Sequence, residues 1–195
     1  MKKLSYSTFN NHSKPIPYPL SEVNDAYIYK LSLLGFPIYT IGWEIDCCGR
    51  LLTFDDKILF FSNYDNVSNH FKLLFSKFEI DFDSFGSSNI EKLNFWIKRG
   101  NFYSIDFHEF GRSHLFFNDV IDSLYKKTRT IIKFNKVRNV LKPDFTEIGK
   151  NFDLTSCKFE EPLVDIYNHT DSFKAFFSLG IKILSKNMII KYGSR

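Results

Sequence analysis

Three β-rich runs separated by very short polar turns constrain the fold more than any other feature of this sequence. They read IYTIGWEID, RLLTF and KILFFSNY, and the turns hold Cys47-Cys48-Gly49 and Asp55-Asp56. Turns this short join neighbouring strands that run in opposite directions. The stretch therefore predicts an antiparallel meander of three strands. The run before it, AYIYKLSLLGF, fits either a strand or a short helix, and we expect Gly35 and Pro37 to end it.

Helical patterns follow the meander. We expect Asn66 to cap one helix, and Ser88-Asn89-Ile90-Glu91 to form a capping box before a second helix that ends at Gly100. Asp106 opens a longer helix, and a last amphipathic helix precedes a closing strand, NMIIKYGSR. The residues that repeat at helical spacing are Val67, Phe71, Leu74, Phe75 and Phe78, then Phe107, Phe110, His114, Phe117, Ile121 and Leu124, and finally Phe173, Phe176, Phe177, Ile181 and Leu184.

These elements predict an α+β fold, in which an antiparallel sheet carries helices packed on one face. We expect residues 1–195 to form a single domain, with 1–20 as an extended arm or edge segment, because Pro15, Pro17 and Pro19 favour extended backbone. A chain of this length buries roughly 70% of its unfolded surface, so it needs no disulfide or structural metal. Its 23 phenylalanines predict a core built from aromatic rings.

The composition points to a globular protein in a reducing compartment. Apolar residues make up 44% of the chain and charged residues 25%. No run reaches the ~18–20 apolar residues that span a bilayer, and the first residues do not resemble a signal segment. Cys47, Cys48 and Cys157 are odd in number, and adjacent cysteines rarely bridge each other. These features predict a soluble, cytoplasmic protein that does not bind membranes.

Asp46, Asp55 and Lys57 are the residues that raise the question of a metal-dependent nuclease. Two carboxylates would hold Mg²⁺ there, and the lysine would lie near the attacking water. If the turn at Cys47 reverses the chain, Asp46 lies opposite Arg50. Asp55 then lies about 16 Å away at ~3.3 Å per residue, whereas carboxylates that share a metal lie within about 5 Å. We therefore interpret Asp55 and the residue after it as a hairpin turn, and a nuclease is the least favoured function.

Two further groups of residues suggest catalysis only weakly. His108 and His114 are six residues apart, whereas a helical zinc motif needs histidines four apart, and we expect His114 to be a core residue. Cys47 and Cys48 lie in a predicted turn, which offers no helix N-terminus to lower a thiol pKa. Neither a glycine-rich phosphate loop nor a serine nucleophile elbow is present. We expect no catalytic residue, no metal and no cofactor, and therefore no enzyme.

The charge pattern is the remaining signal. The segment Lys126–Lys142, KKTRTIIKFNKVRNVLK, holds seven basic residues and no acidic one, and we expect Pro143 to end it. It suits a solvated face, a nucleic-acid backbone or an acidic protein partner. Separated charges favour charge-steered protein recognition. The candidate partner-binding residues are Lys126, Lys127, Arg129, Lys133, Lys136 and Arg138, and the separate acidic region comprises Glu44, Asp46, Asp55, Asp56, Asp65, Glu79, Asp81 and Asp83.

Residues 38–125 combine the meander, a helix with Phe95-Trp96-Ile97, and an aromatic helix with Leu115-Phe116-Phe117-Asn118-Asp119. This layout resembles small immunity proteins of bacterial polymorphic-toxin and contact-dependent growth inhibition systems. The resemblance implies a cytoplasmic, non-catalytic protein that binds one cognate toxin domain and blocks its active site or its access to substrate. It assigns no functional residue. The alternative hypothesis is a nucleic-acid-binding or antitoxin-like protein that uses the Lys126–Lys142 segment.

Overall fold

The computed structural model describes residues 22–45, 48–80, 87–99, 107–150 and 169–192, with the backbone alone for 48, 87, 107–108 and 142–150. The predicted arm 1–20 and the residues Asp46, Cys47, Asp106 and Cys157 lie outside the described residues. The strands are β1 (Asp25–Leu33), β2 (Phe36–Ile45), β3 (Cys48–Leu51), β4 (Thr53–Phe54), β5 (Lys57–Phe61), β6 (Ser87–Asn89) and β7 (Met188–Lys191). The helices are α2 (Tyr64–Leu74), α3 (Ile90–Arg99), α4 (Phe107–Ser123), α5 (Arg129–Lys150) and α7 (Thr170–Lys186).

Within the described residues, the seven strands form one sheet in the order β4-β5-β2-β1-β6, with β3 beside β2 and β7 beside β5. β1 and β2 are antiparallel along their whole length, from Asp25 opposite Glu44 to Leu33 opposite Phe36. β6 pairs with β1 and β7 pairs with β5, both in the parallel direction. The α+β class is confirmed, and the ambiguous run before the meander is a strand. The sheet is mixed rather than purely antiparallel.

The predicted meander lies between β2 and β5, but its middle run is divided. Leu52 separates β3, which pairs with β2, from β4, which pairs with β5. Phe54 lies opposite Lys57, so Asp55-Asp56 are the two residues of the turn, and both have positive φ (51° and 58°). Positive φ at both central residues is the signature of a type I′ hairpin turn. The interpretation of these aspartates as a turn is confirmed.

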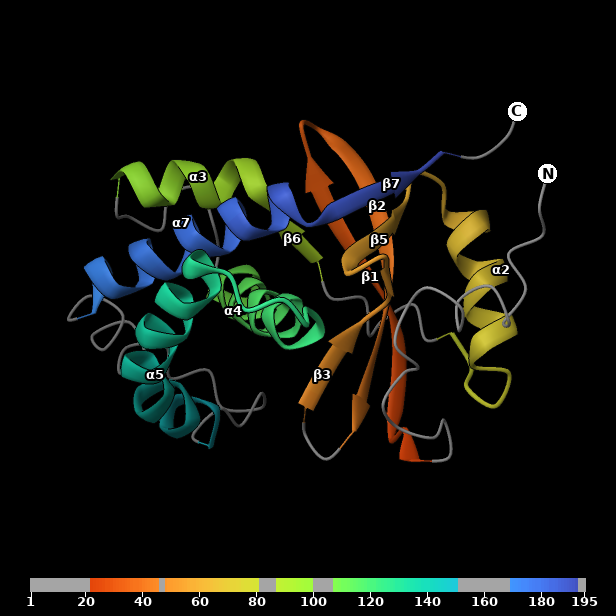
Figure 1. Ribbon diagram of the computed structural model, residues 1–195, viewed down its shortest axis with the longest axis horizontal. Coiled ribbons are helices and arrows are strands. Elements are labelled where there is room, and N and C mark those ends of the chain that lie inside the picture. Colours follow the sequence, from red (N-terminus) through yellow and green to blue (C-terminus); the bar gives the residue numbers. More distant parts are fainter. Residues whose placement is uncertain (1–21, 46–47, 81–86, 100–106, 151–168, 193–195) are drawn as a thin grey trace.

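The sheet carries helices on both of its faces (Figure 1). On one face, α3, α4 and α7 pack against the side of β5 that holds Ile58 and Phe60. On the other face, α2 packs against Leu59 and Phe61 of the same strand. The expectation that all helices lie on one face was wrong. Because successive side chains of a strand point to opposite faces, a strand that is apolar at consecutive positions needs cover on both sides.

Aromatic rings fill the larger core, as predicted. Phe110 packs edge-on against Phe177 at 4.9 Å between ring centroids, and Trp96 packs against Phe110 at the same separation. Gly180 lets α7 approach α4, because a Cβ there would lie 2.6 Å from the ring of Phe117. The predicted apolar stripes of α4 and α7 are buried where their side chains are described, with Leu124 and Ile181 partly exposed at the margin. None of the helices in the described ranges combines the length and apolar composition needed to cross a bilayer.

The predicted helix caps differ from those in the structure. α2 begins at Tyr64, three residues earlier along the chain than predicted, because the side chain of Asn63 accepts from the amide of Asp65 at 2.7 Å. At α3, Asn89 is the residue that caps the helix, with Oδ1 accepting from the amide of Lys92 at 3.0 Å. The predicted capping box was therefore wrong. Ser88 is buried and is used in the core instead.

Pro143 does not end the basic helix. α5 continues through it to Lys150. An interior proline removes one i→i−4 hydrogen bond and its ring crowds the carbonyl of residue i−4, effects that can kink a helix as well as end it.

Candidate functional site

The six predicted partner-binding residues do not form one cluster. Lys126 and Lys127 lie in the link between α4 and α5 and are exposed. Lys126 Nζ lies 3.9 Å from Oδ2 of Asp56, a separation at which a surface ion pair contributes little. The other oxygen of Asp56 accepts from the amide of Tyr125 at 2.9 Å, so the β4–β5 turn holds this link in place.

Arg129, Lys133 and Lys136 come together on one exposed side of α5. Their spacing of three and four residues places them on a single helical face, together with the exposed aliphatic side chains of Ile132 and Val140. We call these five residues the basic face of α5. Within the described chain, no ion pair involves its three cations. The opposite side of the helix is buried and holds Ile131, Phe134 and Leu141.

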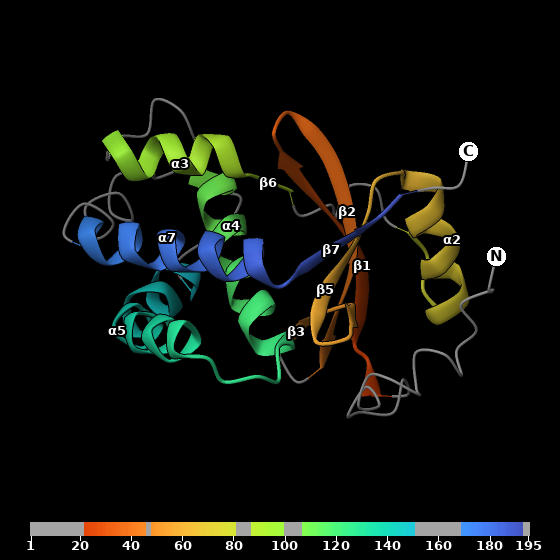
Figure 2. The same cartoon turned by 45° about the horizontal axis from the view of Figure 1, so that its top comes forward.

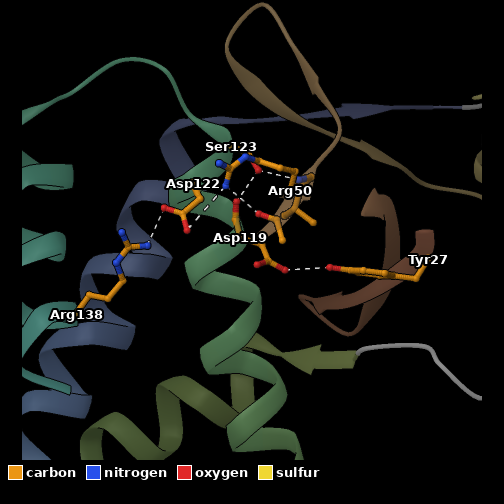
Figure 3. A network of polar contacts seen from close by, with 8 residues as sticks. Tyr27, Arg50, Asp119, Asp122, Ser123 and Arg138 are labelled. Atoms are coloured by element: carbon orange, nitrogen blue, oxygen red, sulfur yellow. Dashed lines mark hydrogen bonds and ion pairs between the residues drawn. The ribbon is translucent and has the colours of Figure 1, made fainter. Parts of the chain in front are cut away.

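Arg138 is directed into the molecule instead. Its Nη1 lies 2.8 Å from Oδ1 of Asp122 on α4, and only 17% of its side chain is exposed. Arg50 of β3 approaches the other oxygen of Asp122 at 4.0 Å (Figure 3). Arg138 thus joins α5 to α4, and we leave it out of the basic face.

A buried polar network lies next to this ion pair (Figure 3). The hydroxyl of Tyr27 donates to Oδ2 of Asp119 at 3.1 Å. Ser123 Oγ donates to the carbonyl of Asp119 at 2.5 Å and accepts from the amide of Leu51 at 2.7 Å. A Cβ on Gly49 would lie 2.1 Å from Oδ1 of Asp119, so a larger residue at this position would displace the carboxylate. The network ties α4 to β1 and β3.

The carboxyl group of this network has a strongly altered acidity. Burial raises the pKa of Asp119 to about 7; the hydrogen bond from Tyr27 opposes this change, and the negative charge of Asp122 adds to it. Burial also raises the pKa of Tyr27, and the negative charge of Asp119 raises it further. A buried acid with a raised pKa is typical of active sites, but also of structural networks. Here the residues next to Asp119 belong to the elements that it joins, β1, β3 and α4, so we assign it a structural role.

A cavity of about 320 Å³ lies elsewhere, beside the β1–β2 hairpin. Its lining includes Lys30, Asn89 and Glu109. Ser88 also lines the cavity, and its Oγ lies 2.7 Å from the hydroxyl of Tyr29 and 2.8 Å from Oγ of Ser113. The cavity therefore has a polar wall that carries both signs of charge.

The predicted metal-ligand candidates are not brought together in the part of the chain that is described. No group of three or more histidine, cysteine, aspartate or glutamate side chains there is placed to hold a metal. Asp46 lies outside this part, and Arg50 lies opposite Trp43, so the predicted pairing of Arg50 with Asp46 was wrong. The side chains of His108, Cys47 and Cys48 also lie outside the described residues.

His114 is a core residue, as predicted. Its ring stacks on Phe176 at 4.6 Å between centroids. Burial, with a smaller contribution from the charge of Arg138, lowers the pKa of His114 to about 3. The imidazole is therefore neutral at physiological pH.

The turn between β1 and β2 is apolar and exposed, which was not expected from the sequence. Leu33 lies opposite Phe36, so Leu34-Gly35 form the turn, and both have positive φ (53° and 75°). Leu34 is 79% exposed and Phe36 is 72% exposed. This hairpin projects at the top of Figure 1 and again in Figure 2. The sequence contained a signal, since a glycine between two apolar residues at the junction of two β-rich runs indicates a hairpin with apolar residues at its end.

Comparison with known proteins assigns no family to the chain: no family model matches it, and no curated protein matches it. Among solved structures, it is similar to the C-terminal domain of SatS in complex with bromine, with 8% identity over 85% of this chain and 94% of that chain. The TM-score is 0.46, a value that supports no inference about fold or function.

Proposed function

We propose that this chain is a cytoplasmic, non-catalytic immunity protein that binds a cognate bacterial toxin domain and blocks its active site or its access to substrate. The observation that carries the proposal is the basic face of α5, where three cations flank two exposed aliphatic side chains. Protein interfaces combine apolar contacts with a polar rim in this way.

The basic face is supported by a rigid core, which favours tight binding. Phe134, on the buried side of α5, packs against Phe176 of α7 at 4.5 Å between ring centroids. Arg138 holds the same helix to α4 through its ion pair with Asp122. A surface that is already ordered loses less conformational entropy when a partner binds.

The charge of the face defines the chemistry of the partner. Arg129, Lys133 and Lys136 attract an acidic surface, and this attraction acts before contact and increases the association rate. A toxin domain with acidic residues around its active site fits this face. Blocking such a site by occlusion requires no chemistry from the immunity protein itself.

The test applies where a large secreted protein with a variable C-terminal domain is encoded directly upstream of this chain's gene, and it uses that C-terminal domain. We expect the two proteins to co-purify, and Lys133→Glu with Lys136→Glu to slow association by at least about tenfold at low salt and to reduce its salt dependence. Lys72→Glu with Lys77→Glu is the matched control, because both lysines are exposed and lie on or just after α2, across the sheet from α5. An association rate that the α5 variant leaves unchanged removes the basic face from the proposal.

The same cations favour a second candidate function, nucleic-acid binding. Three basic side chains on one helical face match the contacts that proteins make with a phosphate backbone. This function predicts binding to a generic duplex or single strand, with an affinity that falls steeply as salt rises from about 50 to 200 mM. Retention of the toxin domain without any binding to nucleic acid would reject it.

A further inference from the structure

The last turns of α4 lie against one edge of β3 (Figure 3). Among the described residues, β3 pairs with β2 alone, and the amide of Leu51 donates to Ser123 Oγ of α4 at 2.7 Å. Ser123 Oγ in turn donates to the carbonyl of Asp119 at 2.5 Å. One turn before Ser123, Oδ1 of Asp119 lies against Gly49. We call Asp119 and Ser123 the latch, because together they occupy a strand edge that has no strand beside it.

The carboxyl group of the latch has no cation of its own. Within the described chain, no ion pair involves Asp119. The guanidinium groups of Arg138 and Arg50 are directed to Asp122 instead, at 2.8 and 4.0 Å. A negative charge on Asp119 is therefore repelled by neighbouring carboxylates and has no close partner of opposite sign. The titratable and charged groups around it are Tyr27 and Tyr29 of β1, Glu44 of β2, Arg50 of β3 and Asp122 of α4.

We infer that the protonated Asp119 carboxyl holds α4 against β3, and that loss of this proton opens the latch and uncovers the edge of β3. This device needs no partner and is independent of the proposed function. Burial raises the pKa of Asp119 to about 7 in the closed latch, whereas in an open latch the carboxyl reaches water and its pKa returns toward 3.8. The closed form binds the proton more tightly, so acid closes the latch, and a rise from about pH 4 to about pH 7 favours opening.

The rest of α4 is held to the core by aromatic contacts, so opening is confined to the latch and β3. Phe116 of α4 stacks on Tyr29 of β1 at 4.5 Å between ring centroids, and Phe110 packs against Phe177 of α7 at 4.9 Å. β3 itself has only four residues. A short element at a sheet edge opens at a lower free energy than the whole fold.

Hydrogen exchange of single amides in the full chain tests the latch. The reporter is the amide of Leu51, and the reference is the amide of Ile58, which donates to the carbonyl of Asn187 at 2.7 Å in another part of the sheet. The protection factor of Leu51 should fall by up to about tenfold per pH unit between pH 5 and 7 and level off above about pH 7. In dilute urea, exchange of Leu51 should change little, because local opening exposes little surface, whereas exchange of Ile58 should accelerate.

Three variants identify the group that titrates. In Asp119→Asn, the protection of Leu51 should not depend on pH. Asp122→Asn is the matched control, one turn along α4, and should retain the fall, with its upper limit at a lower pH because the charge of Asp122 raises the pKa of Asp119. Tyr27→Phe is a second test that keeps Asp119 in place. The hydrogen bond from Tyr27 lowers the pKa of Asp119, so its removal should move the fall to higher pH.

Three results overturn the latch as a pH-sensitive contact. The first is a protection factor of Leu51 that stays constant from pH 5 to 8 in wild type. The second is a fall that persists in Asp119→Asn or disappears in Asp122→Asn, which assigns the titration to another group. The third is equal protection and equal urea dependence of Leu51 and Ile58, which shows that the edge opens only when the whole chain unfolds.

Discussion

The hydroxyl of Tyr27 donates a hydrogen bond to Oδ2 of Asp119 across 3.1 Å, and this contact joins β1 to α4 over 92 residues of sequence. Two glycines make room for it. A Cβ on Gly42 would lie 2.5 Å from the ring of Tyr27, and a Cβ on Gly49 would lie 2.1 Å from the carboxylate of Asp119. The position of α4 on the sheet, and with it the helices that pack on α4, therefore depends on four residues that act together.

The stability of the protein should depend on pH through Asp119. Its pKa is about 7 in the folded chain and 3.8 in the reference state, so the unfolded chain loses its proton first as pH rises. The Asp119 carboxyl makes its full contribution to the free energy of unfolding below about pH 4. This contribution decreases between about pH 4 and about pH 7, by at most about 1.4 kcal/mol per pH unit. In denaturant unfolding from pH 4 to 8, the free energy of unfolding of Asp119→Asn should lack this decline, which wild type should show. If the two proteins differ by the same free energy at every pH in that range, the result contradicts the raised pKa.

His114 should act in the opposite sense. Its pKa is lowered from 6.5 to about 3, so the unfolded chain gains a proton first as pH falls. The stability that the neutral ring contributes is present above about pH 6.5 and is lost below it. Unfolding of His114→Leu between pH 4 and 7 should show a shallower loss on acidification than wild type. A parallel pH dependence of the two proteins would argue against a buried neutral imidazole.

Gly49 and Gly111 should respond to alanine with opposite signs. Gly49→Ala places a methyl group against the Asp119 carboxylate and should lower the free energy of unfolding by about 1–3 kcal/mol. Gly111 lies on α4 with nothing within 4 Å of an added Cβ, so Gly111→Ala should raise it by about 0.5–1 kcal/mol through helix propensity. Urea unfolding at pH 7 measures both changes. A stable Gly49→Ala protein would mean that the network has room to move.

Arg138 and Lys133 should separate stability from binding. Arg138→Ala removes the ion pair with Asp122 and should cost about 1 kcal/mol of folding free energy, because the pair is only partly screened by solvent. Lys133→Ala removes an exposed side chain and should change stability by less than about 0.5 kcal/mol while slowing association with the toxin domain. Thermal unfolding and association kinetics of the two variants distinguish these roles.

The sequence predicted the elements more accurately than the side chains that join them. The apolar run of β5 predicted a strand, and its consecutive apolar residues also contained the signal for two covered faces, which the expectation of helices on one face overlooked. Arg138 lies at helical spacing from Ile131, Phe134 and Leu141, so the spacing alone places it on the buried side of α5. Its ion-pair partner, Asp122, lies 16 residues away on another helix and is not indicated by that spacing. The role of Ser88 likewise depends on Tyr29 and Ser113, contacts that only the tertiary fold creates.

In the candidate site, too, relationships within one helix follow from the local sequence, whereas side-chain exposure depends on the tertiary fold. Helical spacing along α5 gives Arg129, Lys133 and Lys136 a common face, a local relationship that the prediction of six binding residues did not use. The residue type of Leu34 favours burial, since an apolar side chain next to a strand is ordinarily expected to be buried, and only the neighbouring Gly35 indicated the end of a hairpin.

The proposed function is tested by calorimetric titration of a C-terminal toxin domain, taken from a secreted protein encoded directly upstream of this chain's gene where one is present, with the purified protein. The domain's toxic activity is followed in parallel. The proposed function predicts a one-to-one complex with a dissociation constant in the nanomolar range or below, and loss of toxicity at the same molar ratio. A domain that remains free and fully toxic at micromolar excess of this protein would contradict it.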